Sequence, residues 1–289
     1  MEGKSKLNLE LYEDTKVENY FGKWYQDSKL QKEYLDHFKQ VKPYPFIVID
    51  DFLDKDFADL LAGTFPKVSD KWHHYNNPIE VKYALDNLNE MPQEYKDIFH
   101  VLCLNPFLKT LENITEIKGL EHDPYLHGAG LHAHPVNGRL NIHLDYEKHP
   151  FMAKERRLNI ILFLSKDWKE EWKGGLELWK PNMSECEKTM IPKFNTAVLF
   201  RTDGNSFHGL PEKLKCPENV FRQSLAIYYI SDLCTKKSDS MYRYKAKFVK
   251  RPFDPFDERM AKLYEIRANR RISEQDMKEI WPEWNSVDN

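Results

Sequence analysis

Apolar and polar positions follow two different rhythms along the chain. Up to about residue 124 the apolar residues mostly recur at helical spacing. Residues 28–40 show this pattern, which predicts an amphipathic helix with Ser28 as its N-cap. The same reasoning predicts a strand at 45–49, a helix around 57–61, and a helix at 93–111 that is broken or kinked at Pro106.

After residue 124 short apolar segments alternate with turn residues. The segments are 138–146, 158–164, 175–179, 196–201 and 221–230. Strands at such spacing predict an antiparallel sandwich or barrel and not alternating βαβ units.

The last 50 or so residues return to helical spacing, over 254–270 and 274–281. In the first of these helices Phe256, Met260, Leu263 and Tyr264 form a stripe that we expect to pack on the core. We therefore expect one domain, 1–289, mainly β with flanking helices. It comprises an N-terminal helical segment (1–44), a β core with helices (45–235) and a C-terminal strand and helical extension (236–289).

Composition narrows the class of protein. The 289 residues are 41% hydrophobic and carry a formal net charge of −3, so a nucleic-acid binder is not expected. No apolar run is long enough to span a membrane, and residues 1–14 contain no signal-peptide core. The four cysteines form no C-x-x-C pair, which argues against a zinc ribbon or a disulfide scaffold. We expect a cytoplasmic protein.

The candidate chemistry starts with a His-x-Asp triplet in a predicted strand. Side chains at i and i+2 share one face of a strand, so His143 and Asp145 present an imidazole and a carboxylate together. Such a pair suits a divalent metal of the iron type. A third ligand is needed, and His208 can return beside the pair in a small β domain, whereas His149 follows too closely. A buried structural histidine stays open as another interpretation of His208.

Arg222 lies within the otherwise apolar predicted strand 221–230, with Ser224 on the same face. A guanidinium in such a strand is costly unless an anion meets it, and Arg suits bidentate binding of a carboxylate. The residues thus predict a carboxylate receptor. A structural salt bridge with an acidic side chain is the alternative.

The order His143-x-Asp145, His208, Arg222-x-Ser224 resembles the 2-oxoglutarate- and Fe(II)-dependent oxygenases, most closely the prolyl 4-hydroxylase-like branch. Residues 157–168, 172–179 and 207–211 also resemble stretches of that branch. The likeness runs from about 45 to 230. It implies a double-stranded β-helix, the jelly roll also found in cupins, for the core at 45–235.

The resemblance also implies roles. His143, Asp145 and His208 would be catalytic as the Fe(II) ligands, Arg222 and Ser224 would bind 2-oxoglutarate, and O2 would be the oxidant, with ascorbate as a candidate accessory. His134 stands where the family often has a tyrosine that contacts 2-oxoglutarate. The pair His132 and His134 could itself pass for metal ligands, although no carboxylate stands beside it at strand spacing.

Two other segments have plain interpretations. Residues 72–75 (WHHY) are expected to be a partly buried loop, although they could line a substrate mouth. Residues 245–251 (KAKFVKR) are expected to be a solvated edge strand and not a nucleic-acid patch.

The implied function is a hydroxylase that acts on a C–H bond, with a prolyl residue in a peptide or protein as the first substrate and succinate as a product. Three alternatives stay open. The first is a dioxygenase that acts on a small molecule, such as an amino acid, a sugar or a lipid-linked precursor. The other two are a non-catalytic jelly-roll binding module and a zinc hydrolase. A homodimer formed through the helical segments at the two ends of the chain is one expected arrangement.

Overall fold

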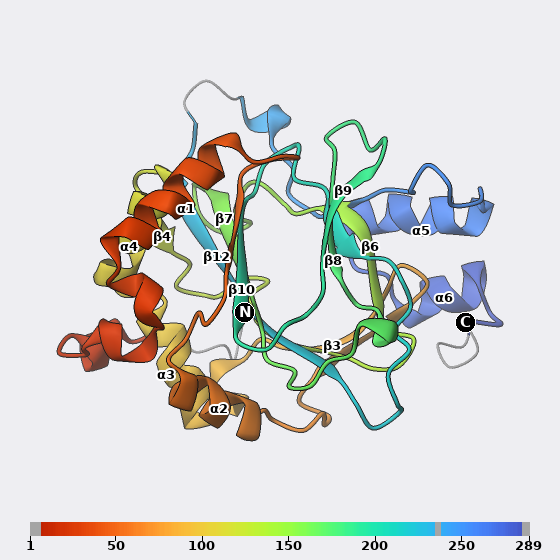
Figure 1. Ribbon diagram of the computed structural model, residues 1–289. Helices are drawn as coiled ribbons and strands as arrows, with labels where there is room; N and C mark the ends of the chain where they lie inside the picture. The colour runs from red at the N-terminus through yellow and green to blue at the C-terminus, as the bar shows by residue number, and fades with distance from the viewer. Residues whose placement is uncertain (1–6, 235–237, 285–289) are drawn as a thin grey trace.

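The computed structural model describes residues 7–234 and 238–284, and it is mainly β with flanking helices, as predicted (Figure 1). The helices are α1 (Ser28–Gln40), α2 (Lys55–Gly63), α3 (Gln93–Val101), α4 (Asn105–Thr115), α5 (Glu258–Asn269) and α6 (Glu274–Ile280). The first four gather on one side of the sheet, and α5 and α6 lie on the opposite side (Figure 1).

The strands form one antiparallel, curled sheet. They are β1 (Phe46–Ile49), β2 (His73–Asn77), β3 (Glu80–Leu85), β4 (Glu121–His122), β5 (Gly130–His134), β6 (Arg139–Leu144), β7 (Lys154–Phe163), β8 (Leu176–Trp179), β9 (Cys186–Met190), β10 (Thr196–Arg201), β11 (His208–Leu210), β12 (Arg222–Asp232) and β13 (Lys247–Phe248). Their order is β1-β10-β7-β12-β5-β3-β6-β11-β8-β9, with β13 on β6, β2 on β3 and β4 on β12.

The two faces of the central β7–β12 pair have different surroundings. On the outer face, apolar residues pack against α3 and α4 in one large core; this set includes Leu158, Ile160, Leu162, Leu225, Ile227 and Tyr229. Tyr229 also donates a hydrogen bond to the carbonyl of Leu102, just after α3 (3.0 Å). The alternate residues of both strands face inward, toward a second, smaller apolar core and a polar cavity.

Helix boundaries differ from the prediction at several points, and two of the differences have a clear local cause. The N-cap of α1 is Asp27 and not Ser28, because the Asp27 carboxylate accepts hydrogen bonds from the backbone N–H groups of Lys29 and Leu30. The predicted helix 93–111 is two helices, α3 and α4. Pro106 lies in the first turn of α4, where its missing N–H leaves no helical hydrogen bond unmade.

The six predicted strands, at 45–49 and in the five segments after residue 124, are all present, but polar strands escaped prediction. The expected loop at 72–75 is wrong: His73 begins β2, whose sequence HHYNN has no apolar alternation and is held by its pairing with β3. The expected core contact of Phe256 is also wrong, since this side chain precedes α5 and is 78% exposed. Within 245–251, β13 pairs with β6 and buries Phe248.

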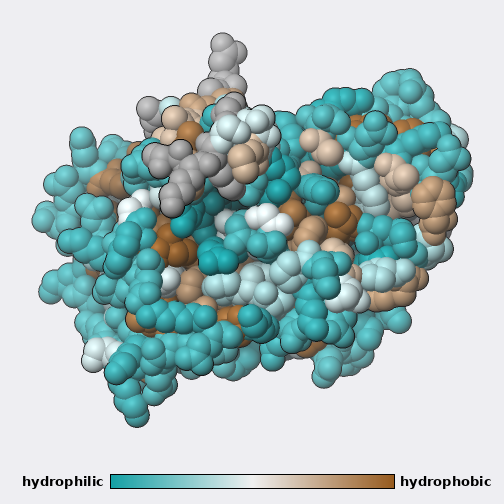
Figure 2. Space-filling view, turned by 90° about the horizontal axis from the view of Figure 1, so that it is seen from above, coloured by the Kyte–Doolittle hydropathy of each residue, from teal (hydrophilic) through white to brown (hydrophobic). Residues whose placement is uncertain are grey.

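One face of the molecule is dominated by hydrophilic residues (Figure 2). Figure 2 shows one face as mostly hydrophilic, with smaller hydrophobic groups near its middle and toward the α5–α6 side. No helix within residues 7–234 and 238–284 combines the length and apolar character needed to cross a membrane.

Candidate active site

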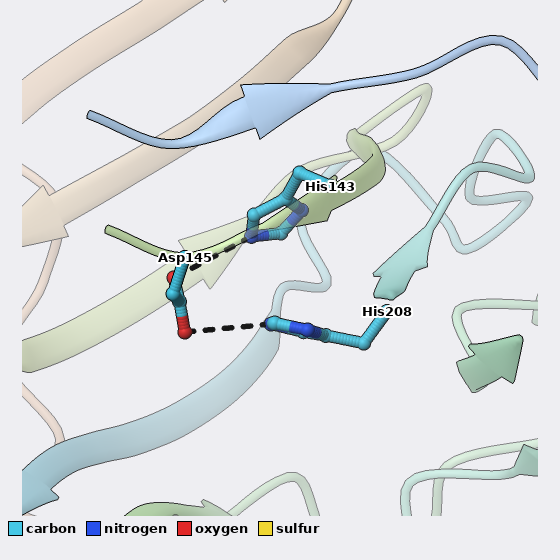
Figure 3. A group of neighbouring side chains, drawn as sticks. All are labelled: His143, Asp145 and His208. Atoms are coloured by element: carbon cyan, nitrogen blue, oxygen red, sulfur yellow. Dashed lines mark ion pairs between the residues drawn. The ribbon is translucent and has the colours of Figure 1, made fainter. Parts of the chain in front are cut away.

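Two neighbouring strands bring the His-x-Asp pair and the distal histidine together. His143 lies near the end of β6, Asp145 follows that strand, and His208 begins β11. In the antiparallel ladder His208 is the direct partner of His143, so the distance along the chain is closed by strand pairing. Figure 3 shows the three side chains pointing into one space.

The three side chains form a compact set of donor atoms. Asp145 Oδ1 lies 3.8 Å from His143 Nε2, and its Oδ2 lies 3.7 Å from His208 Nε2 (Figure 3). One donor atom from each residue lies within 4.8 Å of the others, and all three residues are buried. This spacing is what a single bound ion would bridge.

Both imidazoles are oriented by their other nitrogen. His143 Nδ1 lies 2.9 Å from the carbonyl oxygen of Asn141, and His208 Nδ1 lies 2.8 Å from that of Ser206. A backbone carbonyl can only accept, so each Nδ1 carries the proton and each Nε2 turns its lone pair toward Asp145. Neutral imidazoles with this tautomer are ready to bind a metal.

The electrostatics favour the same protonation states. Burial, together with the neighbouring His208, lowers the pKa of His143 to about 3. Burial also lowers the pKa of His208. For Asp145 burial acts to raise the pKa, but the positive charges of Arg156 and Arg243 act against it, and the pKa lies below its usual value. At neutral pH the set is two neutral imidazoles and one carboxylate.

Arg156 supports the carboxylate. Its Nη1 lies 3.4 Å from Asp145 Oδ1, and its Nη2 donates to the carbonyl of His127 (3.1 Å). The guanidinium carbon lies 3.5 Å and 3.3 Å from the ring centroids of Tyr146 and Tyr228, so two aromatic rings clamp it. The clamp fixes the cation beside Asp145.

Arg222 is almost fully buried at the start of β12. Its exposed fraction is 2%, its Nε donates to the carbonyl of Gly174 (2.7 Å), and its guanidinium carbon lies 5.0 Å from the Phe163 ring. Burial alone lowers its pKa to about 9. Among the residues that the structure describes, no carboxylate lies within ion-pair distance, so the alternative of a structural salt bridge has no partner there.

Polar groups surround Arg222 in the cavity. On the neighbouring β5, His134 is its direct partner in the ladder, and Ser224 stands opposite His132. His134 is 2% exposed, and neither of its ring nitrogens makes a hydrogen bond to the described residues. Burial and the Arg222 charge hold its pKa well below the usual value, so its ring is neutral.

These groups line one cavity of about 250 Å³. Of the described buried side chains that have a polar atom without a hydrogen-bond partner, four line this cavity: His134, Asp145, Arg156 and Asn159. Buried polar atoms are nearly always satisfied, so their concentration here indicates that the cavity receives a polar guest. An unpartnered Asp145 Oδ2 beside two Nε2 lone pairs fits a divalent cation.

Several residues of this cavity were missed from the sequence. Arg156 could have been found by the reasoning that found Arg222, because it is also a cation within a buried strand. Lys82 comes from β3, whose polar sequence gave no strand signal, so nothing pointed to it, whereas Tyr75 on β2 belongs to the segment 72–75 that was named as a possible lining of a substrate mouth. His149 pairs with Asp123 (3.2 Å) and does not join the triad.

Comparison with known sequences finds a match over the segment that carries the predicted site residues. The family model described as the 2OG-Fe(II) oxygenase superfamily matches residues 129–230, which include every predicted site residue. A prolyl 3-hydroxylase OGFOD1 from Xenopus laevis is 28% identical over 185 residues, covering 61% of this chain and 33% of the relative. The chain thus spans about a third of the length of that curated relative.

Solved structures agree on the fold. A Pseudomonas putida prolyl-4-hydroxylase matches with a TM-score of 0.52 and 14% identity, covering 71% of this chain and 100% of its own. The alpha ketoglutarate dependent epimerase SnoN from nogalamycin biosynthesis matches with a TM-score of 0.50 and 8% identity, covering 78% and 85%. At these identities the likeness shows the fold, and it confirms the predicted jelly-roll class.

Proposed function

We propose that this chain, whose residues 129–230 belong to the 2OG-Fe(II) oxygenase superfamily, is an Fe(II)- and 2-oxoglutarate-dependent dioxygenase that hydroxylates a C–H bond. The proposed substrate is a prolyl residue in a peptide or protein, in line with the similarity to a prolyl 3-hydroxylase from Xenopus laevis. The observation that carries the proposal is a donor triad and an unpaired buried arginine lining one cavity.

The triad would hold the metal on one side only. His143, Asp145 and His208 supply two imidazole nitrogens and a carboxylate oxygen, the ligand set of non-haem Fe(II) oxygenases, which leaves positions open toward the cavity. When bound, Fe(II) supplies the oxidative chemistry: O2 and 2-oxoglutarate are consumed, carbon dioxide and succinate are released, and the substrate C–H becomes C–OH. Arg156 would keep the Asp145 carboxylate ionised and in place.

Arg222 would bind the distal carboxylate of 2-oxoglutarate. Its Nε is already used by Gly174, which fixes the guanidinium and leaves its two Nη atoms for the carboxylate. Ser224 would donate its hydroxyl proton to the same group, and the neutral His134 would donate one ring N–H. This would satisfy the buried cation and the unpartnered imidazole at once.

Apolar residues of the second, smaller core would exclude water from the reaction. Phe163, Leu176 and Phe200 belong to the inner core and are at most 2% exposed. A dry wall strengthens the ionic contacts of Arg222 and protects a reactive site from side reactions.

The test measures succinate formation from 2-oxoglutarate with Fe(II), O2 and a panel of blocked proline-containing peptides. Mass spectrometry of each peptide detects the added oxygen atom. We expect one or more peptides to gain oxygen in step with succinate. His37→Ala is a matched control for variants of the triad, because His37 is an exposed histidine on α1.

The same assay separates the substrate classes. Coupled turnover with free amino acids or sugars and none with peptides would replace the peptide by a small molecule and leave the oxygenase proposal intact. A protein that binds metal and 2-oxoglutarate but never forms succinate would be a binding module. A cytoplasmic location, a homodimer, no binding of nucleic acid, and ascorbate as an accessory stay predictions from the sequence.

A further inference from the structure

Lys82 stands in the cavity without a role in the proposed chemistry. It lies in the middle of β3, where Glu80, Lys82 and Ala84 alternate toward the cavity while Val81 and Leu85 are buried behind them. Only 12% of its side chain is exposed. An ammonium group in such a place is costly unless an anion or several acceptors meet it.

The partners of Lys82 within the protein are weak. Its ammonium nitrogen lies 4.0 Å from Glu80 Oε2, at the limit of an ion pair, and 5.1 Å from the centroid of the Tyr75 ring. Glu80 is held more closely by Arg267, whose Nε lies 2.8 Å from Glu80 Oε1. Within residues 7–234 and 238–284, Lys82 makes no ion pair with another carboxylate and no hydrogen bond.

The cavity as a whole has more basic than acidic side chains. Its acidic residues are Glu80, Asp86 and Asp145, and its basic residues are Lys82, Arg156, Arg222, Lys245, Arg267 and Arg271. Arg156 faces Asp145 and Arg267 faces Glu80, so these charges are compensated inside the protein. The remaining positive charge favours a negatively charged guest.

Two different carboxylates would be needed to satisfy the two underpaired cations. Arg222, at the start of β12, takes the distal carboxylate of 2-oxoglutarate in the proposed function. Lys82 belongs to β3, two strands away in the sheet order, and β3 pairs both with β5, which carries His134, and with β6, which carries His143. It therefore lines the cavity from a strand that neighbours β6, on which the triad residue His143 lies and which the reacting substrate has to approach.

We propose that Lys82 binds a carboxylate of the substrate itself, so that the preferred substrate is a peptide with an Asp or Glu side chain next to the residue that is hydroxylated. This inference rests on the proposed function for the identity of the substrate. Arg271 and Lys245, exposed residues that also line the cavity, extend the positive charge outward and favour acidic side chains further along the peptide.

The test is a binding measurement that needs no turnover. Two peptides, N-acetylated and C-amidated, carry proline between two Glu or between two Gln residues, so only side-chain carboxylates differ. Each is titrated under anaerobic conditions into the protein loaded with 2-oxoglutarate and Ni(II), and the affinity is measured by calorimetry. We expect the Glu peptide to bind at least about tenfold more tightly, the scale of one charge-assisted hydrogen bond.

Variants assign the preference to Lys82. In Lys82→Met the ratio between the two peptides should fall to about one, and Lys82→Arg should retain most of it. Lys188→Met, at an exposed lysine on β9, should keep the full ratio. The affinity for 2-oxoglutarate alone should change less than about twofold in Lys82→Met, because its carboxylate is bound by Arg222.

Four results would overturn the inference: equal binding of both peptides by the wild-type protein, no binding of either, a preference that survives in Lys82→Met, or a tenfold loss of 2-oxoglutarate affinity in that variant. The wild-type comparison stands even if Lys82→Met does not fold. If the Glu peptide binds through Lys82 but gains no oxygen when Fe(II) and O2 are supplied, the carboxylate site is supported and the prolyl substrate is wrong.

Discussion

The two faces of the β7–β12 strand pair are built from alternate residues of the same sequence and have opposite characters. The outer face presents Leu225 and Ile227 to the helices, in a dry apolar core. The inner face presents Arg222 and Ser224, buried just as deeply, to a cavity with unsatisfied polar atoms. Burial alone thus says little about the role of a residue here. The face of the strand decides whether it serves stability or chemistry.

The largest effect is expected at the metal site on the inner side of the molecule. Asp145→Ala removes the only carboxylate of the triad and with it the charge that binds a divalent cation. We expect coupled succinate formation to fall by more than about a hundredfold. Replacing a residue that only supports a metal ligand can already lower activity by that factor, and Asp145 is proposed to be a ligand itself. The midpoint of thermal unfolding should not fall. Full activity of Asp145→Ala, with His37→Ala as control, would exclude the triad.

On the outer face the effect should be on stability. Leu225→Ala removes a fully buried side chain from the large core. We expect the free energy of unfolding in urea to fall by about 2–5 kcal/mol, the usual loss for a cavity of this kind. The 2-oxoglutarate requirement of the folded variant should be unchanged. A raised requirement would mean that the two faces are not independent.

On the inner face, Arg222→Met should weaken the binding of 2-oxoglutarate and leave the stability of the protein unchanged. The variant keeps most of the side-chain volume and removes the cation, so the 2-oxoglutarate concentration for half-maximal turnover should rise by about thirtyfold, or ~2 kcal/mol. The free energy of unfolding without ligand should not fall, because the deleted charge had no carboxylate partner among the described residues. A large loss of stability with an unchanged requirement would make Arg222 a structural residue.

Arg156→Met should weaken the metal site without removing a ligand. The variant loses the contact with Asp145 and keeps an apolar side chain between Tyr146 and Tyr228. We expect the affinity for Fe(II) to fall by about tenfold. This is the smaller of the effects usually seen when a residue that supports a metal ligand is replaced. Competition with a coloured chelator measures it. Arg157→Met, at the neighbouring and more exposed arginine, should have no effect.

The smallest effect is expected at Ser224, which can be compared directly with its neighbour Leu225 on the other face of the strand. Ser224→Ala, next to Leu225, removes one hydroxyl from the inner face. We expect the 2-oxoglutarate requirement to rise by about fivefold, or ~1 kcal/mol, the net contribution of one hydrogen bond. Unfolding in urea should shift far less than for Leu225→Ala. Equal losses of stability at the two positions would contradict the division between faces.

The sequence predicted those features that depend on local pattern. Short apolar segments between turn residues identified six strands, and the period of two within a strand placed His143 and Asp145 on one face. Chain order and the resemblance suggested His208, whose ladder pairing with His143 depends on the closure of the whole sheet. Their roles as ligands, and the role of Arg222, stay predictions that the variants above test.

What escaped prediction depends on tertiary pairing. The strand β2, with the sequence HHYNN, is extended because it pairs with β3, and no propensity within it says so. Lys82 therefore had no place in the sequence-based site, although it lies in the cavity. Phe256 fitted the helical stripe of 254–270, but α5 begins only at Glu258, which leaves its ring outside the core.

The most direct test of the account is an anaerobic titration of the purified protein with Fe(II) and then with 2-oxoglutarate, recorded by visible absorption. We predict a weak charge-transfer band that requires both additions, is lost in Asp145→Ala, and needs more 2-oxoglutarate in Arg222→Met. A folded protein that binds Fe(II) but shows no band with 2-oxoglutarate would contradict the oxygenase assignment.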